Sequence, residues 1–126
     1  MKREKIEWME AGPEMDFLVD EHIQPLKRNG SFDGYPAYDN PKDGNLLIVG
    51  RPNYSTDIAA AWFVIEKMHE KYKCDVSITL RADLQYCKIQ GGTLEYDNPS
   101  VMLVCKADTI PLAICRAALL AVMDLS

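Results

Sequence analysis

Apolar residues recur at helical spacing in two stretches of the chain. Residues 54–72 place apolar side chains three and four positions apart with charged residues between them, which predicts an amphipathic helix capped by Ser55 or Thr56. Its expected inner face consists of Ile58, Ala61, Trp62, Ile65, Met68 and Tyr72. An earlier helix is expected from Pro13, after a short helical turn at 3–9, with an inner face of Met15, Leu18, Val19, His22 and Ile23.

Residues 110–124 are apolar around almost the whole circumference of a third helix, which carries one charge in its middle, Arg116. Such a helix is covered on more than one side. It is shorter than the roughly 20 apolar residues that cross a bilayer. We therefore expect the central packing element of a domain, and no membrane association.

The apolar period changes to two after residue 74. Residues 75–81 alternate, a second strand is expected at 84–90, and Gly91-Gly92 predicts a tight hairpin into a strand at 93–96. Residues 101–105 are apolar on both alternating sides, which predicts a central strand with both sheet faces covered. Residues 24–53 are rich in Gly, Pro, Asn and Asp and predict an irregular loop with a brief strand at 46–49. Its aromatic residues Phe32, Tyr35 and Tyr38 favour partial order and contact with something.

This order of elements predicts an α+β fold. We expect an α/β/α sandwich in which a small antiparallel sheet of three to four strands is covered by helices on its faces. The length of 126 residues fits one domain over 1–126.

Charge and cysteine content narrow the function classes. The net charge of −5 opposes binding to nucleic acid or anionic lipid, both of which need a positive surface. No apolar stretch of signal-peptide length follows the basic residues 2–5, so we expect a cytoplasmic protein. Cys74, Cys87, Cys105 and Cys115 form no C-x-x-C pair, and we expect reduced, structural thiols without a bridge.

Three segments have residue sequences more specific than a general helix or strand pattern requires. They are M-E-A-G-P-E-M-D at 9–16, Y-S-T-D-I-A-A-A-W-x-V-I-E-K-M at 54–68, and A-D-T-I-P-L-A-I-C-R-A-A-L-L-A-V at 107–122. Together they resemble the small phage and prophage proteins that carry a phage ABA sandwich domain. The resemblance covers nearly the whole chain except residues 24–53 and the hairpin near Gly91. It implies an α/β/α sandwich and carries no functional residues with it.

Two places are candidate ligand sites. Tyr54, Ser55 and Thr56 offer amides and hydroxyls at a helix N-terminus, but the Asp57 carboxylate that follows would repel a phosphate, so ordinary capping is favoured. Arg116 needs a partner or must reach solvent, because an unpaired buried guanidinium is unfavourable by several kcal/mol.

For Arg116 the expected partner is a carboxylate, from Asp57, Glu66, Asp108 or a second subunit, and a bound anion is the alternative. In the ion-pair case, replacing Arg116 by alanine should destabilise the protein by about 3 to 5 kcal/mol.

For the tryptophan, histidine, serine and cysteine residues, the sequence favours structural roles over chemical ones. Trp62 lies on the expected inner face of its helix and is predicted to be core. His22 and His69 have no ligand spaced for zinc, so no metal or other cofactor is expected. No serine or cysteine lies on a nucleophile elbow, and we do not expect an enzyme.

We therefore expect a phage- or prophage-encoded accessory protein that acts in the host cytoplasm by binding a phage or host protein or by self-association. The simplest assembly is a two-fold homodimer, which would cover surplus apolar surface. The alternative is a small-ligand binder that sequesters an anionic or nucleotide-type host molecule. Its pocket would be lined by Tyr54, Ser55, Thr56, Arg81, Arg116 and the loop aromatics.

Overall fold

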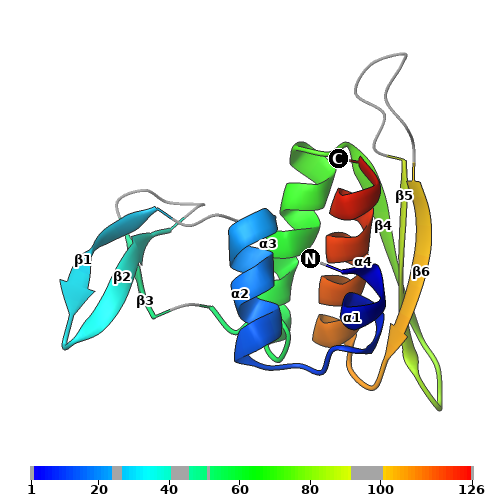
Figure 1. Ribbon diagram of the computed structural model, residues 1–126, viewed down its shortest axis with the longest axis horizontal. Coiled ribbons are helices and arrows are strands. Elements are labelled where there is room, and N and C mark those ends of the chain that lie inside the picture. Colours follow the sequence, from blue (N-terminus) through cyan, green and yellow to red (C-terminus); the bar gives the residue numbers. More distant parts are fainter. Residues whose placement is uncertain (1, 24–26, 41–45, 51, 92–100, 126) are drawn as a thin grey trace.

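The computed structural model describes residues 2–23, 27–40, 46–50, 52–91 and 101–125 (Figure 1). The helices are α1 (Arg3–Trp8), α2 (Pro13–His22), α3 (Ile58–Glu70) and α4 (Ile110–Leu125). The strands are β1 (Arg28–Phe32), β2 (Tyr35–Asp39), β3 (Leu47–Val49), β4 (Cys74–Leu80), β5 (Gln85–Gly91) and β6 (Val101–Ala107). The predicted α+β fold class is confirmed, and so are the three helical stretches within a few residues at each end.

Helix α4 is the centre of the main body. It lies against β5 and β6 on one side and contacts α1, α2 and α3 on its others (Figure 1). Every residue from Pro111 to Val122 is buried except Arg116, as expected for a helix that is apolar on all sides. The alanines of α4 present small side chains, so neighbouring helices can approach its backbone closely.

Strands β4, β5 and β6 form an antiparallel meander, as predicted, and β5 is its central strand. The prediction of a central strand at 101–105 with both faces covered is wrong. In the described part of the chain β6 is an edge strand, and its outward-facing Met102 and Val104 are 66% and 58% exposed. The helices lie against the opposite face, so the apolar character of these two side chains does not reflect burial within this chain. The predicted hairpin at Gly91-Gly92 and strand at 93–96 lie outside the described residues.

Helix α3 is rotated relative to its predicted inner face. Its fully buried side chains are Ala60, Ala61, Val64 and Met68, whereas Trp62 is 51% exposed. The prediction that Trp62 is core is therefore wrong. The small side chains Ala60 and Ala61 face inward, which suits close packing of α3 on the alanine-rich α4. His22, also expected on an inner face, is exposed at the end of α2.

The prediction that Ser55 or Thr56 caps α3 is wrong. Asp57 is the N-cap, and its carboxylate accepts a hydrogen bond from the Ala59 amide at 2.9 Å. Ser55 instead lies in the preceding turn, where it is fully buried.

The segment expected to be irregular contains a second sheet. Strands β1, β2 and β3 pair in that order, and both pairs are antiparallel. Of these three strands, the sequence predicted only the one near 46–49. Ala37 and Tyr38 are buried, whereas the side chains of Phe32 and Tyr35 on either side of the β1–β2 turn are exposed. Asp33 and Gly34 have the two positive φ values of that turn, a backbone conformation that Asp and Gly adopt more readily than most residues. This sheet lies beside α2, apart from the sandwich (Figure 1).

Candidate ligand-binding cleft

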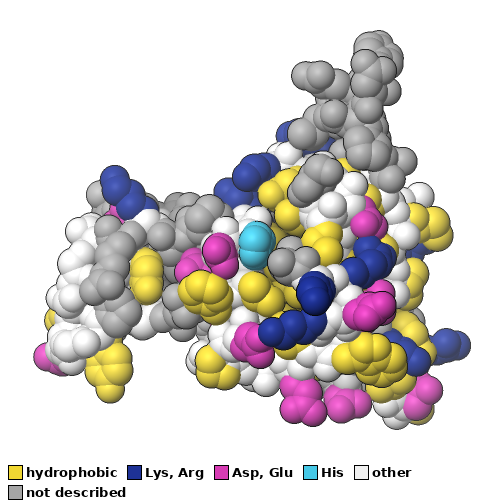
Figure 2. Space-filling model, viewed as in Figure 1, with side chains coloured by type: hydrophobic (Ala, Val, Ile, Leu, Met, Phe, Trp, Pro, Cys, Tyr) yellow, Lys and Arg dark blue, Asp and Glu magenta, His cyan; other side chains and the backbone are white. Residues whose placement is uncertain are grey.

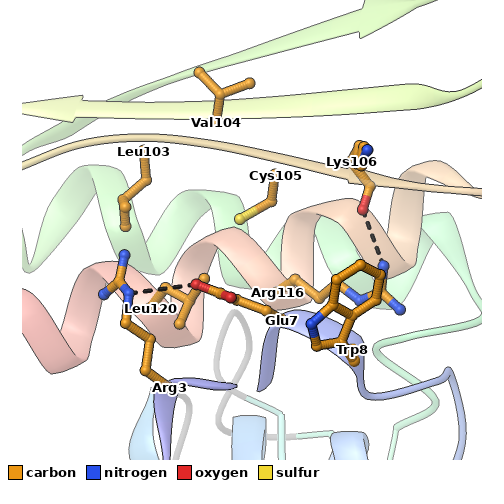
Figure 3. A pocket seen from close by; sticks show the side chains of 9 residues that line it. All are labelled: Arg3, Glu7, Trp8, Leu103, Val104, Cys105, Lys106, Arg116 and Leu120. Atoms are coloured by element: carbon orange, nitrogen blue, oxygen red, sulfur yellow. Dashed lines mark hydrogen bonds and ion pairs between the residues drawn. The ribbon is translucent and has the colours of Figure 1, made fainter. Parts of the chain in front are cut away.

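A cleft of about 230 Å³ opens between α1 and the edge strand β6, with α4 as its floor (Figure 3). One wall comes from α1 and the other from the β6 edge. The lining residues are Arg3, Glu7, Trp8, Leu103, Val104, Cys105, Lys106, Arg116 and Leu120.

Arg116 is held at the floor of this cleft by main-chain oxygens. Its Nε and Nη2 donate to the Met9 carbonyl at 3.0 and 2.8 Å, and its Nη1 donates to the Lys106 carbonyl at 2.9 Å. No carboxylate forms an ion pair with it in the described part of the chain. The predicted ion pair with Asp57, Glu66 or Asp108 is therefore wrong. The guanidinium instead joins the link after α1 to strand β6, and no carboxylate among the described residues neutralises its charge.

The other charged groups of the cleft differ in their partners. Arg3 contacts Asp124 at 2.9 Å and Glu7 at 3.4 Å, so its charge is balanced. Lys106 is exposed on β6 and has no ion-pair partner among the described residues. The cleft thus carries the positive charge of Arg116, and Lys106 adds a second one on the strand that forms a wall of the cleft. Neither has a carboxylate partner among the described residues, in a protein whose net charge is −5. Such a local excess attracts anions.

Trp8 connects this cleft to a second one. The second cleft, of about 610 Å³, lies toward the start of α4 and shares Trp8, Lys106 and Arg116 with the first. Trp8 is 76% exposed at the end of α1, which makes it the most exposed large apolar side chain among the described residues. Figure 2 shows apolar and charged side chains mixed over this face of the molecule. An exposed indole beside a guanidinium offers a planar stacking surface next to a charge.

Cys105 lines the cleft with its sulfur facing α4 (Figure 3). Burial raises the pKa of this thiol to about 11, although the Arg116 and Arg3 charges lower it and Glu7 raises it. Burial also raises the pKa of Cys87 to about 12, with the nearby Cys105 adding to the rise. Both thiols are therefore protonated at neutral pH and are poor nucleophiles there.

The sequence profile of the phage ABA sandwich domain matches residues 17–119. The chain belongs to this phage-associated family. No curated protein and no solved structure matches it. The matched segment of this phage ABA sandwich protein includes β6 and most of α4, whereas α1, with Arg3, Glu7 and Trp8, precedes it.

The structure separates the ligand residues expected for this phage ABA sandwich protein. Arg116 lies in the cleft, whereas Arg81 follows β4 and lies over the Tyr86 ring at 5.7 Å. Tyr54 and Ser55 are buried and Thr56 is exposed, all three in the turn before α3. The loop aromatics Phe32, Tyr35 and Tyr38 belong to the separate β1–β3 sheet.

Ser55 is engaged by a carboxylate that the sequence analysis did not single out. Asp16, only 5% exposed, accepts from the Ser55 amide at 2.8 Å and from the Ser55 hydroxyl at 2.7 Å. The Ser55 hydroxyl oxygen in turn accepts from the Gly12 amide at 2.9 Å. This network joins residues 9–16 and 54–68, two segments that the sequence pattern singles out, which was a usable signal for Asp16 even though Asp16 precedes the matched residues 17–119. Arg3, Trp8 and Lys106 had no such signal, because nothing in their spacing indicates that α1 lies beside β6.

The described residues of the phage ABA sandwich protein contain no group of three or more His, Cys, Asp or Glu side chains placed to hold a metal ion. None of their helices combines the length and the apolar character needed to cross a membrane.

Proposed function

We propose that this phage ABA sandwich protein binds an anionic small molecule in the cleft between α1 and β6. The observation that carries the proposal is the guanidinium of Arg116, which lines both adjoining clefts and has no carboxylate partner in the described part of the chain. The proposed site of action is the host cytoplasm, where a phage-encoded protein is made.

The chemistry of the cleft supports a ligand that joins a negative group to a planar one. A guanidinium has five N–H donors, and the hydrogen bonds of Arg116 leave some of them for a phosphate or carboxylate oxygen. Lys106 at the rim adds a mobile positive charge, and Trp8 offers an aromatic face. A nucleotide combines both chemistries, as does any other aromatic phosphate.

We propose retention of this molecule rather than its conversion. The thiol in the cleft, Cys105, is protonated at neutral pH because its pKa is raised to about 11, and Glu7 already faces Arg3 at 3.4 Å. Neither group is arranged as an activated nucleophile or as a free base, which supports binding without turnover. Sequestration of a host molecule is the simplest activity for such a site.

Tryptophan fluorescence gives a direct test, with ADP as the probe and uncharged adenosine as its control. The protein has two tryptophans, Trp8 in the cleft and Trp62 on α3, and both are exposed. In the Trp62→Ala variant the emission comes from Trp8 alone, and we expect ADP to quench it saturably. In the Trp8→Ala variant we expect no quenching, and calorimetry should show binding weakened about tenfold through the lost stacking.

A charge-matched pair completes the test. We expect Lys106→Ala to weaken ADP binding and to reduce its dependence on salt, whereas Lys71→Ala, at the distant end of α3, should leave both unchanged. Equal binding of ADP and adenosine, or equal behaviour of the two lysine variants, would contradict an anion site in this cleft. Failure of ADP and of inorganic pyrophosphate alike to bind would overturn the proposal.

Self-association is a second candidate function, favoured by the open edge of β6. Met102 and Val104 are exposed on this edge strand, with which no described strand pairs on its outer side. If two copies pair β6 antiparallel about Val104, Met102 of each copy lies opposite Lys106 of the other, so no like charges meet. Such a dimer would have one continuous sheet.

Light scattering at micromolar concentration tests this second candidate. We expect a dimer that Val104→Asp converts to monomer, while Leu80→Asp on the opposite edge strand, also exposed, leaves it intact. A wild-type monomer would rule out the homodimer.

A further inference from the structure

Cys87 and Cys105 are direct neighbours across the sheet. The register of β5 and β6 places them opposite each other. Cys87 belongs to the buried core and Cys105 packs against it, so both side chains lie on the inner face of the sheet. Directly opposed residues of an antiparallel pair also share a face by geometry.

The contact of Arg116 reveals which kind of pair the two cysteines form. Because Arg116 bonds the Lys106 carbonyl, that carbonyl points away from β5. Main-chain groups alternate in direction along an antiparallel strand, so those of Cys105 point toward β5 and exchange hydrogen bonds with Cys87. Such a pair has a Cα separation of about 5.5 Å. This Cα separation lies within the range found in disulfides, but the Cβ atoms of such a pair are about 5.5 Å apart, whereas those of a disulfide are about 3.5–4.5 Å apart. A bridge between the two cysteines is therefore strained and easily reduced, which makes it reversible.

The two thiols differ in their access to solvent. Cys87 is completely buried, whereas Cys105 is half-buried and faces the α1–β6 cleft (Figure 3). A small reagent in the cleft therefore meets Cys105 first, with Cys87 directly behind it. An accessible thiol backed by a second thiol is the arrangement of a redox-sensitive pair.

We propose that Cys105 and Cys87 form a reversible disulfide when a small disulfide such as glutathione disulfide enters the cleft. The Cys105 thiolate attacks one sulfur of glutathione disulfide, forms a mixed disulfide and releases one glutathione thiolate. The Cys87 thiolate then attacks the Cys105 sulfur, the mixed disulfide breaks, and a second glutathione thiolate leaves. The two cysteines are oxidised, the reagent is reduced to two thiols, and the two cysteine protons go to solvent. The bridge needs no other ligand in the cleft, and the reduced thiols expected from the sequence are its starting state.

The surroundings of Cys105 predict the pH dependence of the reaction. Arg116 of α4 and Arg3 of α1 favour its thiolate, Glu7 of α1 disfavours it, and Cys87 faces it from β5. With burial included, the pKa of Cys105 is about 11. The rate of bridge formation should therefore rise about tenfold per pH unit at all pH values well below this pKa.

Intact-mass spectrometry and peptide mapping of the full chain, incubated with glutathione disulfide at mildly alkaline pH, test the proposal. We expect the wild type to lose two hydrogens, with the bridge joining Cys87 to Cys105. Cys87→Ala should trap one glutathionyl group on Cys105. Cys105→Ala should not react, while Cys74→Ala, the matched loss of a buried thiol at the other end of the same face, should behave as the wild type.

Three results would overturn the proposal. They are a wild type that keeps four thiols while the urea-unfolded chain reacts, a stable glutathione adduct on wild-type Cys105, and a bridge to Cys115 or Cys74. Because Cys105 is only half-buried, Cys105→Ala keeps the test valid if Cys87→Ala does not fold. Circular dichroism of each variant establishes that it is folded.

Discussion

Replacement of Arg116 by alanine tests how the cleft is held together. The side chain makes hydrogen bonds to two carbonyls, Met9 and Lys106, and thereby ties the link after α1 to β6. Hydrogen bonds from a charged donor contribute about 1.5–3 kcal/mol each. Water can replace the guanidinium at the exposed Lys106 carbonyl, whereas the Met9 carbonyl is partly buried and loses two donors at once.

The expected loss in the free energy of unfolding is therefore about 2 kcal/mol. In a domain of this size it corresponds to a fall in melting temperature of about 8 °C. The loss is smaller than for a broken buried ion pair, because no carboxylate is left behind in the core.

Urea denaturation followed by circular dichroism at neutral pH measures this loss. Arg3→Ala is the control, because its two ion pairs are on the surface and should contribute less than about 1 kcal/mol. Arg116→Lys should fall between the wild type and Arg116→Ala, since an ammonium keeps the charge but cannot bridge both carbonyls in the same geometry. Equal stability of Arg116→Ala and Arg3→Ala would refute the bridging role. A loss that disappears at acidic pH would reveal a carboxylate partner instead.

Three further predictions concern the core. Asp16→Ala and Ser55→Ala should each destabilise by about 1–3 kcal/mol, and a double-mutant cycle should be non-additive because both remove the buried hydrogen bond between the Ser55 hydroxyl and the Asp16 carboxylate; additive losses would contradict the network. Trp62→Ala should change stability by less than about 1 kcal/mol, whereas Met68→Ala, on the buried face of the same helix, should lose about 2–5 kcal/mol, both measured by urea denaturation. Because the pKa of Cys87 is raised from 9.0 to about 12, the unfolded chain releases this proton first. Stability should thus fall as the pH rises above 9.0 toward 12, and less steeply in Cys87→Ala; parallel pH profiles would refute this assignment.

The sequence pattern predicts the parts of the fold that depend on local periodicity. Helix α4 and strand β4 follow from spacing alone, because burial on all sides and alternation are visible within each segment, whereas the uniformly apolar β6 was wrongly assigned to the centre of the sheet. The buried side of α3 was missed because Ile58 and Trp62 give the larger apolar signal, whereas the fit of small alanines against α4 decides the packing. The β1–β2 hairpin was missed because its strands are rich in Gly, Pro and Asp, which single-segment patterns assign to loops.

The candidate site was predicted only at Arg116. Its position as the one charge in an apolar helix signalled a need for partners, but main-chain carbonyls have no signature in the sequence. Carboxylates were the only partners that residue identities could suggest. Trp8 and Lys106 come close to Arg116 because α1 and β6 both pack on α4, which brings together segments about a hundred positions apart in the chain.

The separate position of β1–β3 bears on how this sequence can diverge. These strands pair with one another and, in the described residues, make few contacts with the sandwich. Mutations in these strands therefore do not disturb the packing around α4, on which the remainder of the protein depends. This sheet can therefore be lengthened, shortened or replaced while the packing of the sandwich is kept. The region between α2 and α3 is thus where this chain can acquire a different surface at little risk to folding.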